Sequence, residues 1–327
     1  MTLFESRASV ILYNALISLK INKNIDKDGK FIIPLNVCPI VPAVFIKAKI
    51  DFDFIDISMK TLCVDDELLL AKIKREKNIS GVLFVKTYGT EDDFTEVFRS
   101  IKQVNSKIFI INDNCLKMPD FEYDIEASLC DLTIFSTGYS KYVDIGWGGF
   151  GFLKDKYTYC KTKLLFSSDD LNQLTGEINK SLLENSDLKY IDRDWLGSEI
   201  CLYSDLSQYT KRIKHDLLKI KKHKSIINNI YSNNLAKDIQ FRKVFWDWRF
   251  SIFINNKKQL MEKIFDSGLF ASSHYEDIGF MYGYKEGGNI SNAKRVHSNV
   301  VNLFNDFRFS KQDAHKLVDI INKHLKG

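Results

Sequence analysis

Short apolar runs alternate with longer amphipathic stretches through the first 155 residues of the chain. The apolar runs are rich in β-branched and aromatic residues, and they predict strands at 31–33, 52–55, 82–85, 108–111, 132–135 and 149–152. Apolar positions at helical spacing predict helices near 8–19, 41–47, 65–74 and 94–103. This alternation is typical of an α/β fold with a mostly parallel sheet covered by helices.

The pattern changes twice along the rest of the chain. Residues 161–235 read as helical, and from about residue 238 a second α/β pattern predicts strands at 250–254 and 300–303 and helices at 258–266 and 311–324. The sequence therefore predicts a large domain over 1–160, a helical connecting region over 161–235 and a small C-terminal α/β domain over 236–327.

A basic stretch near the end of the connecting region has two interpretations. Residues 211–224 contain seven Lys and Arg but one acid, Asp216. Such a run can bind an anionic surface, or it can be the solvated face of a helix. Ile213, Ile220 and Ile227 give it an apolar stripe at helical spacing, which favours the solvated face.

The composition of the chain argues against several classes of partner and site. The 327 residues are 45% hydrophobic and carry a net charge of +5, which is too small to indicate a nucleic-acid partner. The longest informative uncharged run, 31–46, contains three prolines and is shorter than the roughly 20 residues that a membrane helix needs. The first residues show no signal-peptide pattern, so we expect a cytoplasmic protein without a membrane partner. The six cysteines form no CxxC pair, and no metal site is predicted.

Candidate chemistry follows two of the predicted strands. Asp113 comes just after the run 108–111, where it can be a buried functional carboxylate or a residue that caps a loop. Ser136 and Lys141 follow the strand at 132–135, and a glycine-rich turn leads from there into the next strand. Each feature is weak alone, because a lysine after a strand is usually exposed and the glycines lack a nucleotide-binding spacing.

The combination is more specific, because Asp113 and Lys141 follow two strands of one predicted sheet. Pyridoxal phosphate (PLP) needs a lysine for covalent attachment and a carboxylate that keeps its pyridine nitrogen protonated. It also needs hydroxyls and backbone N–H groups for its phosphate. None of these groups is a histidine, and the first 214 residues contain no histidine.

Over nearly its whole length the sequence resembles the DegT/StrS-type sugar aminotransferases, which are PLP-dependent enzymes of fold type I. The stretches that carry the resemblance are SRASVILYNAL (6–16), FIIPLNVCPIVPAVFIKAKIDFDFIDI (31–57), VLFVKTYG (82–89), IFIINDN (108–114) and FSTGYSKYVDIGWGGFGF (135–152). The resemblance implies a large domain with a mostly parallel central sheet flanked by helices, and a small C-terminal α/β domain.

The resemblance also implies roles for single residues. Lys141 matches the lysine that binds PLP as a Schiff base, Asp113 matches the carboxylate on the pyridine nitrogen, and both are expected to be catalytic. Ser136 matches a phosphate-binding serine. The family usually has a Gly-Thr pair for phosphate at a helix N-terminus, and the residues at that place here are Arg7, Ala8 and Ser9.

Three positions depart from the family pattern. Cys38 falls in the cofactor site, where the family usually has an aromatic residue stacked on the pyridine ring. Leu116 falls where a Gln or His often bonds the ring hydroxyl, and Trp147 replaces an acid in a glycine-rich turn. These departures affect the expected substrate and reaction more than the expected cofactor.

The expected function is therefore transfer of an amino group from an amino acid, glutamate by resemblance, to a keto sugar nucleotide or another phosphorylated carbonyl compound in surface polysaccharide biosynthesis. Two alternatives stay open. One is a PLP-dependent decarboxylase or dehydratase, motivated by Cys38 and Leu116, although related dehydratases have lost the lysine that is present here as Lys141. The other is a catalytically silent, ligand-binding relative. The resemblance also implies a homodimer with active sites at its interface.

Overall fold

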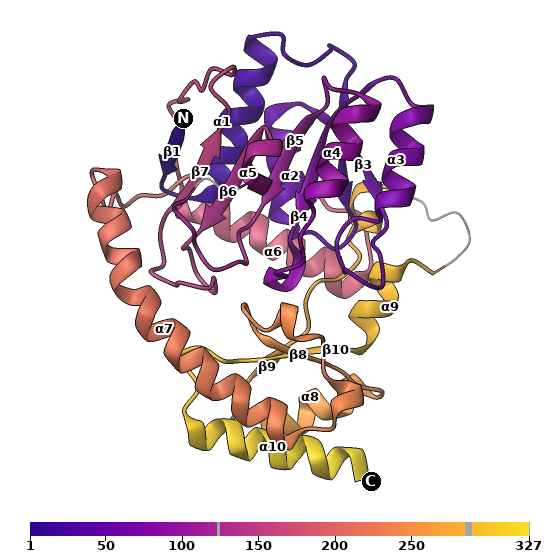
Figure 1. Ribbon diagram of the computed structural model, residues 1–327, viewed down its shortest axis with the longest axis vertical. Coiled ribbons are helices and arrows are strands. Elements are labelled where there is room, and N and C mark those ends of the chain that lie inside the picture. The colour runs from indigo at the N-terminus through magenta and orange to yellow at the C-terminus, as the bar shows by residue number, and fades with distance from the viewer. Residues whose placement is uncertain (123–124, 285–289, 327) are drawn as a thin grey trace.

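Two β-sheets and their surrounding helices make up the computed structural model, which describes residues 1–122, 125–284 and 290–326 (Figure 1). The larger sheet has seven strands in the order β1-β7-β6-β5-β4-β2-β3, and the smaller has three in the order β8-β10-β9. In the larger sheet β2 to β6 run parallel, whereas β7 is antiparallel to both β6 and β1.

The larger sheet contains all six strands predicted between residues 31 and 152. Its strands are β1 (Thr2–Glu5), β2 (Lys30–Pro34), β3 (Asp51–Ile55), β4 (Ile79–Val85), β5 (Phe109–Asp113), β6 (Leu132–Ser136) and β7 (Gly149–Leu153). The helices around it are α1 (Ala8–Ile21), α2 (Ile40–Ala48), α3 (Asp66–Arg75), α4 (Thr95–Val104) and α5 (Ile125–Leu129). Strand β1 and helix α5 were not predicted, because four or five residues are too few to show a period.

The rest of the chain forms two long helices and the smaller sheet. Helices α6 (Ser168–Glu184) and α7 (Leu206–Asn234) are separated by a non-helical stretch, so the connecting region is less uniformly helical than expected. The smaller sheet consists of β8 (Phe250–Phe253), β9 (Ala271–Ser272) and β10 (Val300–Leu303), with α8 (Lys257–Asp266), α9 (Asn292–Asn299) and α10 (Lys311–Lys326) beside it. The predicted strands and helices of this part are present.

Helices cover both faces of the larger sheet, which explains why its central strands are buried and mostly apolar. In β5, Phe109 and Ile111 belong to a buried cluster with α1 and α2, whereas Ile110 belongs to a cluster on the other face with α3 and α4. Alternate side chains of a strand point to opposite faces, so a strand that is buried on both faces shows no polar alternation. The fold is the mixed α/β architecture that the sequence predicted.

Helix α7 connects the two sheets. In Figure 1 the helix runs from beside the larger sheet to the smaller sheet. Its Ile213 and Ile220 pack beside β7, and its Ile227 and Tyr231 lie in the core around the smaller sheet. Six of the seven basic residues in 211–224 are exposed, as expected for a solvated face.

Lys224 is the exception among those basic residues. It is buried, and its Nζ donates to the carbonyl of Trp248 at 2.8 Å and to Asn305 Oδ1 at 2.7 Å. Burial lowers the pKa of Lys224 to about 7. The solvated-face interpretation was therefore wrong for this one residue, which binds the helix to the loops of the C-terminal part.

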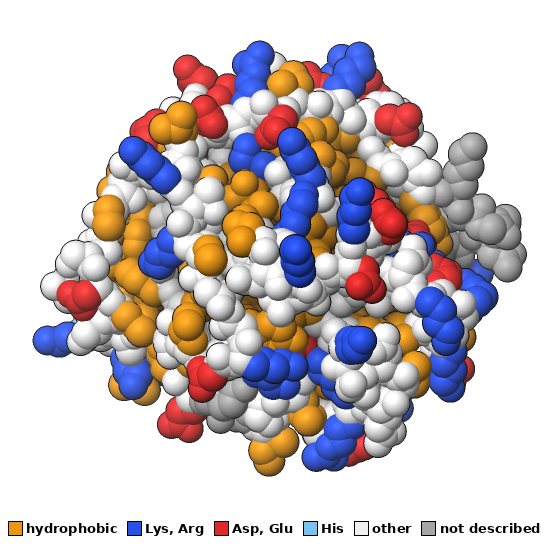
Figure 2. Space-filling model, turned by 90° about the horizontal axis from the view of Figure 1, so that it is seen from above, with side chains coloured by type: hydrophobic (Ala, Val, Ile, Leu, Met, Phe, Trp, Pro, Cys, Tyr) orange, Lys and Arg blue, Asp and Glu red, His pale blue; other side chains and the backbone are white. Residues whose placement is uncertain are grey.

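The surface and the helices bear on membrane and anion binding. On the face seen in Figure 2, Lys and Arg side chains are spread among acidic and hydrophobic ones and do not gather into one patch. Within 1–122, 125–284 and 290–326, no helix combines the length and the apolar composition that a membrane span requires.

Gly151 provides a test of the packing in the larger sheet. A Cβ atom at this position of β7 would lie 2.3 Å from the carbonyl oxygen of Thr133, which the sheet holds in place. We expect Gly151→Ala to lower the free energy of unfolding by about 1–3 kcal/mol or more. Gly176 in α6 has open space around it, so Gly176→Ala is the control and is expected to raise stability by up to about 1 kcal/mol. Denaturant unfolding measures the free energy of unfolding of both variants. Equal changes in the two variants would contradict the close contact between Gly151 and the Thr133 carbonyl.

Candidate active site

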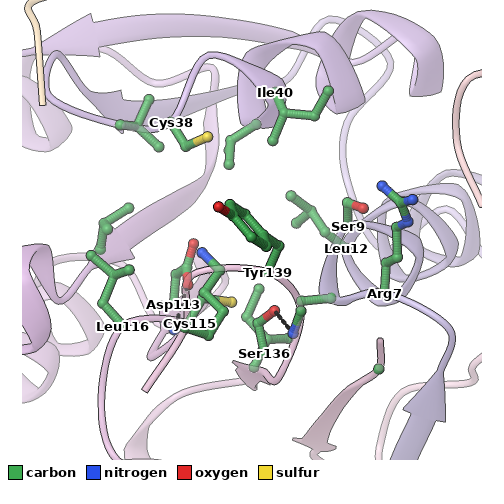
Figure 3. Close-up of a pocket in the computed structure, with 18 of the residues that line it drawn as sticks. Arg7, Ser9, Leu12, Cys38, Ile40, Asp113, Cys115, Leu116, Ser136 and Tyr139 are labelled. Atoms are coloured by element: carbon green, nitrogen blue, oxygen red, sulfur yellow. Dashed lines mark hydrogen bonds between the residues drawn. The ribbon is translucent and has the colours of Figure 1, made fainter. Parts of the chain in front are cut away.

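A cavity of about 360 Å³ opens where the parallel strands of the larger sheet end (Figure 3). Its walls come from the first turns of α1, from the turn between β2 and α2, and from the carboxyl ends of β4, β5 and β6. The loop 137–148 and Tyr275 of the C-terminal part complete it. Parallel α/β sheets commonly bind ligands at this edge, because loops and helix N-termini meet there.

All the site residues predicted from sequence line this one cavity: Arg7, Ala8, Ser9, Cys38, Asp113, Ser136 and Lys141. They come from α1, the turn before α2, β5, β6 and the loop after β6. The structure therefore brings together residues that are up to 134 positions apart in the sequence (7 to 141). Their roles remain predictions.

Asp113 is the last residue of β5 and is only 7% exposed. Its Oδ1 accepts a hydrogen bond from the backbone N–H of Cys115 at 2.9 Å. Within the described part of the chain, no Lys, Arg or His lies within ion-pair distance of this carboxylate. A buried carboxylate without a cation normally requires compensation, so Asp113 is suited to a cationic or N–H group of a ligand in the cavity.

Lys141 has an amine without a protein partner among the described residues, although its backbone is held in place by a hydrogen bond from its N–H to the Gly138 carbonyl at 3.3 Å. Lys141 is half-buried, whereas Lys86 and Lys224 are buried and bonded: Lys86 Nζ donates to Glu126 at 2.6 Å, and Lys224 Nζ donates to two oxygens. Those two amines stabilise the protein, whereas that of Lys141 is available to a ligand.

Three contacts hold the loop before Lys141. The backbone N–H of Ser140 donates to Asp144 Oδ2 at 2.7 Å. Trp248 Nε1 donates to the Ser140 carbonyl at 2.8 Å, and Arg249 donates to the Ser140 hydroxyl at 2.7 Å. Two of these contacts come from the C-terminal part, so that part positions the loop that carries the lysine.

The N-terminus of α1 forms another wall of the cavity. Its N-cap residue, Arg7, makes no side-chain cap, and the first N–H groups of a helix have no acceptor within it. Gly149 allows β7 to pass directly under this turn, since a Cβ there would lie 2.4 Å from the backbone nitrogen of Ala8. Ser136 Oγ, which accepts a hydrogen bond from the Gly138 N–H at 3.3 Å, lies near this wall in Figure 3. The first N–H groups of α1 and the hydroxyl proton of Ser136 can be donated to an anion bound at this wall.

The departures from the family pattern also fall on the cavity. Cys38, Leu116 and Trp147 all line it. From the C-terminal part, Tyr275 lines the cavity, whereas Arg249 does not line it and donates to the hydroxyls of Ser140 and Ser272.

The lining residues that were not predicted from the sequence include Asn36 and Tyr139. Asn36 follows β2 and leaves its buried Oδ1 without a partner among the described residues, and Tyr139 lies between the two selected residues Ser136 and Lys141. Asn36 carries a recognisable sequence signal, because it is a polar residue just beyond the end of the apolar strand β2.

The donor set fits PLP. A buried carboxylate without a cation suits a protonated pyridine nitrogen, an amine without a partner suits covalent attachment to an aldehyde, and an uncapped helix N-terminus with a serine suits a phosphate. Residues Asp113, Lys141 and Ser136 would hold these three parts, together with the first turn of α1.

Comparison with solved structures gives the same fold. A DegT DnrJ EryC1 StrS aminotransferase from Brucella abortus has a TM-score of 0.67 at 15% identity, covering 99% of this chain and 85% of that one. The sugar aminotransferase CalS13 from Micromonospora echinospora has a TM-score of 0.66 at 16% identity, covering 98% and 87%. GDP-4-keto-6-deoxymannose-3-dehydratase (ColD) has a TM-score of 0.64 at 16% identity, covering 98% and 88%.

The chain has the fold of the PLP-dependent sugar aminotransferases. This confirms the predicted fold type I architecture over nearly the whole length of the chain. No protein-family model matches the sequence, and a search of curated protein sequences finds no match. At identities of 15% and 16%, the likeness to these structures shows the fold alone.

The reactivity of the cysteines tests the environment of the cavity. Burial and the nearby Asp113 carboxylate raise the pKa of the Cys115 thiol well above its usual value, whereas Cys201 is exposed. The thiolate is the reactive form, so we expect iodoacetamide at pH 8 to modify Cys201 at least roughly tenfold faster than Cys115. Mass spectrometry of the alkylated peptides measures both rates. Equal rates would contradict the arrangement of Asp113 and Cys115.

Proposed function

We propose that this protein is a PLP-dependent aminotransferase. It would transfer an amino group from glutamate to a keto sugar nucleotide or another phosphorylated carbonyl compound used in surface polysaccharide biosynthesis. The observation that carries the proposal is the single cavity lined by Asp113, Lys141, Ser136 and the uncapped N-terminus of α1. The neighbours described as sugar aminotransferases support the substrate class, and ColD is described with bound GDP-perosamine, a sugar nucleotide.

In the proposed reaction, Asp113 provides a negative charge next to the pyridine nitrogen of the cofactor. Its carboxylate would accept a hydrogen bond from the pyridine N–H of the cofactor and would keep the proton on that nitrogen. When bound, PLP supplies an electron-poor ring that accepts the electrons left when a proton is removed from the carbon next to the substrate amine. The low exposure of Asp113 strengthens its interaction with that ring, because water screens charges less inside a protein.

Lys141 moves the proton. Its amine has no described protein partner, and the contacts at Ser140 keep the loop at the cavity wall, so Nζ can take a proton from the substrate carbon and return it. The Ser136 hydroxyl and the first-turn N–H groups of α1 would hold the phosphate. Arg7 at the start of α1 would add a charged donor on the same side.

Conversion of glutamate tests the function. The protein loaded with PLP is expected to produce one 2-oxoglutarate per cofactor in the absence of an acceptor. Lys141→Ala should slow this step by about 100-fold to 10,000-fold, since a positioned proton-transfer group contributes that much. Lys219→Ala, an exposed lysine on α7, is the matched control.

Other outcomes would favour the alternatives. Full activity in Lys141→Ala would contradict the role of this lysine. Release of carbon dioxide from an amino acid without an oxo acid would indicate a decarboxylase. Dehydration of a keto sugar nucleotide would indicate a dehydratase like ColD, and failure to bind PLP at all would indicate a ligand-binding relative.

A cytoplasmic location forms part of the proposal. All six cysteines are free thiols, which is usual for proteins of a reducing compartment.

We also propose a two-fold symmetric homodimer. Large apolar side chains are exposed in and around the stretch that joins α6 to α7, and they include Leu165 at 66% and Leu183 at 88% exposure, together with Ile200 and Leu202. A second copy of the chain would bury them. Sedimentation at micromolar concentration is expected to give a species of about twice 37.9 kDa. We expect the interface of this dimer to bury more than roughly 2,000 Å² in total. A single species of 37.9 kDa that binds PLP would contradict the dimer.

A further inference from the structure

We infer that the ring of Tyr139 stacks on the pyridine ring of the cofactor and so provides the aromatic contact that Cys38 cannot. The inference rests on the proposed function, because it assumes a planar pyridine ring in the cavity. It concerns a residue outside the predicted site, and it follows from which aromatic rings around the cavity are already engaged.

Three aromatic residues line the cavity, and two are held by other contacts. Trp147 is buried, donates through Nε1 to the carbonyl of Ile200 at 2.7 Å and packs against the Phe4 ring at 5.5 Å between centroids. The ring of Tyr275 is stacked on that of Trp248, with centroids 5.8 Å apart and an interplanar angle of 22°. Neither ring can turn toward a ligand without losing these contacts.

Tyr139 differs from both. It is 78% exposed, and among the described residues its ring contacts no other aromatic ring. Its one described ring contact is the guanidinium of Arg308, 5.5 Å from the ring centroid, and Arg308 is itself bonded to Asp306 at 2.8 and 2.6 Å. A large aromatic ring left this open at a cavity mouth can gain contact area from a ligand.

The backbone on both sides of Tyr139 is fixed. Before it, Gly138 donates to Ser136 Oγ, and after it Ser140 makes its three contacts with Asp144, Trp248 and Arg249. The side chain therefore starts from a fixed point at the cavity wall and retains only its own rotations. In Figure 3 the ring points into the cavity, with Cys38 and Ile40 on one side and Asp113 and Ser136 on the other.

The chemistry of the two rings is complementary. The phenol ring of tyrosine is electron-rich, whereas a pyridine ring protonated opposite Asp113 is electron-poor, so offset stacking is favourable. Cys38 lines the same cavity but has no π-system and a small side chain. Tyr139 is thus the described residue with both the position and a free ring face for this contact.

Binding of 4′-deoxypyridoxine 5′-phosphate tests the inference. This probe has the ring and the phosphate but no aldehyde, so it cannot bond covalently to Lys141 and reports only non-covalent contacts. We expect Tyr139→Leu to weaken its binding by about twofold to tenfold, which is the usual contribution of an aromatic pair, and Tyr139→Phe to leave the affinity unchanged. Tryptophan fluorescence quenching measures the dissociation constants without any turnover.

The control is Phe270→Leu, which removes an exposed ring outside the cavity and should not change the affinity. The melting temperature without ligand should be the same in all variants, because both rings are exposed. Equal affinity of Tyr139→Leu and the unmodified protein would overturn the inference and leave the proposed function intact. An equal loss of probe affinity in Tyr139→Phe and Tyr139→Leu would overturn the stacking inference, because it would show that Tyr139 acts through its hydroxyl. Failure of the unmodified protein to bind either the probe or PLP would overturn the proposed function as well.

Discussion

The parallel pairing of β5 with β4 and β6 is the constraint on which the site depends. In this register Asp113 lies opposite Val85 of β4 and Ile134 of β6, so it reaches the same sheet edge as Ser136. Apolar residues on both faces of β5 fix the register, because a shift by one residue would exchange the two buried faces and move the carboxylate. The position of the acid therefore follows from the packing of the core.

The position of Lys141 depends on a second constraint, which comes from the C-terminal part of the chain. The guanidinium of Arg249 is buried between the rings of Trp248 and Phe304, with its Cζ 4.4 and 4.0 Å from their centroids, and it donates to the Ser140 hydroxyl. Neither Trp248 nor Arg249 lines the cavity, yet both hold the loop that does. The smaller sheet thus contributes to the site mainly through support of this loop.

The sequence predicted the large sheet well because its central strands are buried on both faces and consist mostly of apolar residues. It also predicted that Asp113, Ser136 and Lys141 come together at one edge of this sheet, because they follow two apolar runs of the same predicted sheet; their roles stay predictions. Burial of Lys224 was not predicted, since its sequence neighbours are exposed cations and its partners, Trp248 and Asn305, are distant in the chain. Tyr139 was missed for a similar reason. Its importance follows from the engagement of Trp147 and Tyr275, which only the tertiary structure shows.

The most direct measurement of the central claim is an electron-density map of crystals grown with PLP. The arrangement predicts density continuous from Lys141 Nζ to the cofactor, with the ring nitrogen within hydrogen-bond distance of the Asp113 carboxylate and the phosphate at the first turn of α1. PLP bound elsewhere, or bound in this cavity with its ring nitrogen away from Asp113, would contradict it.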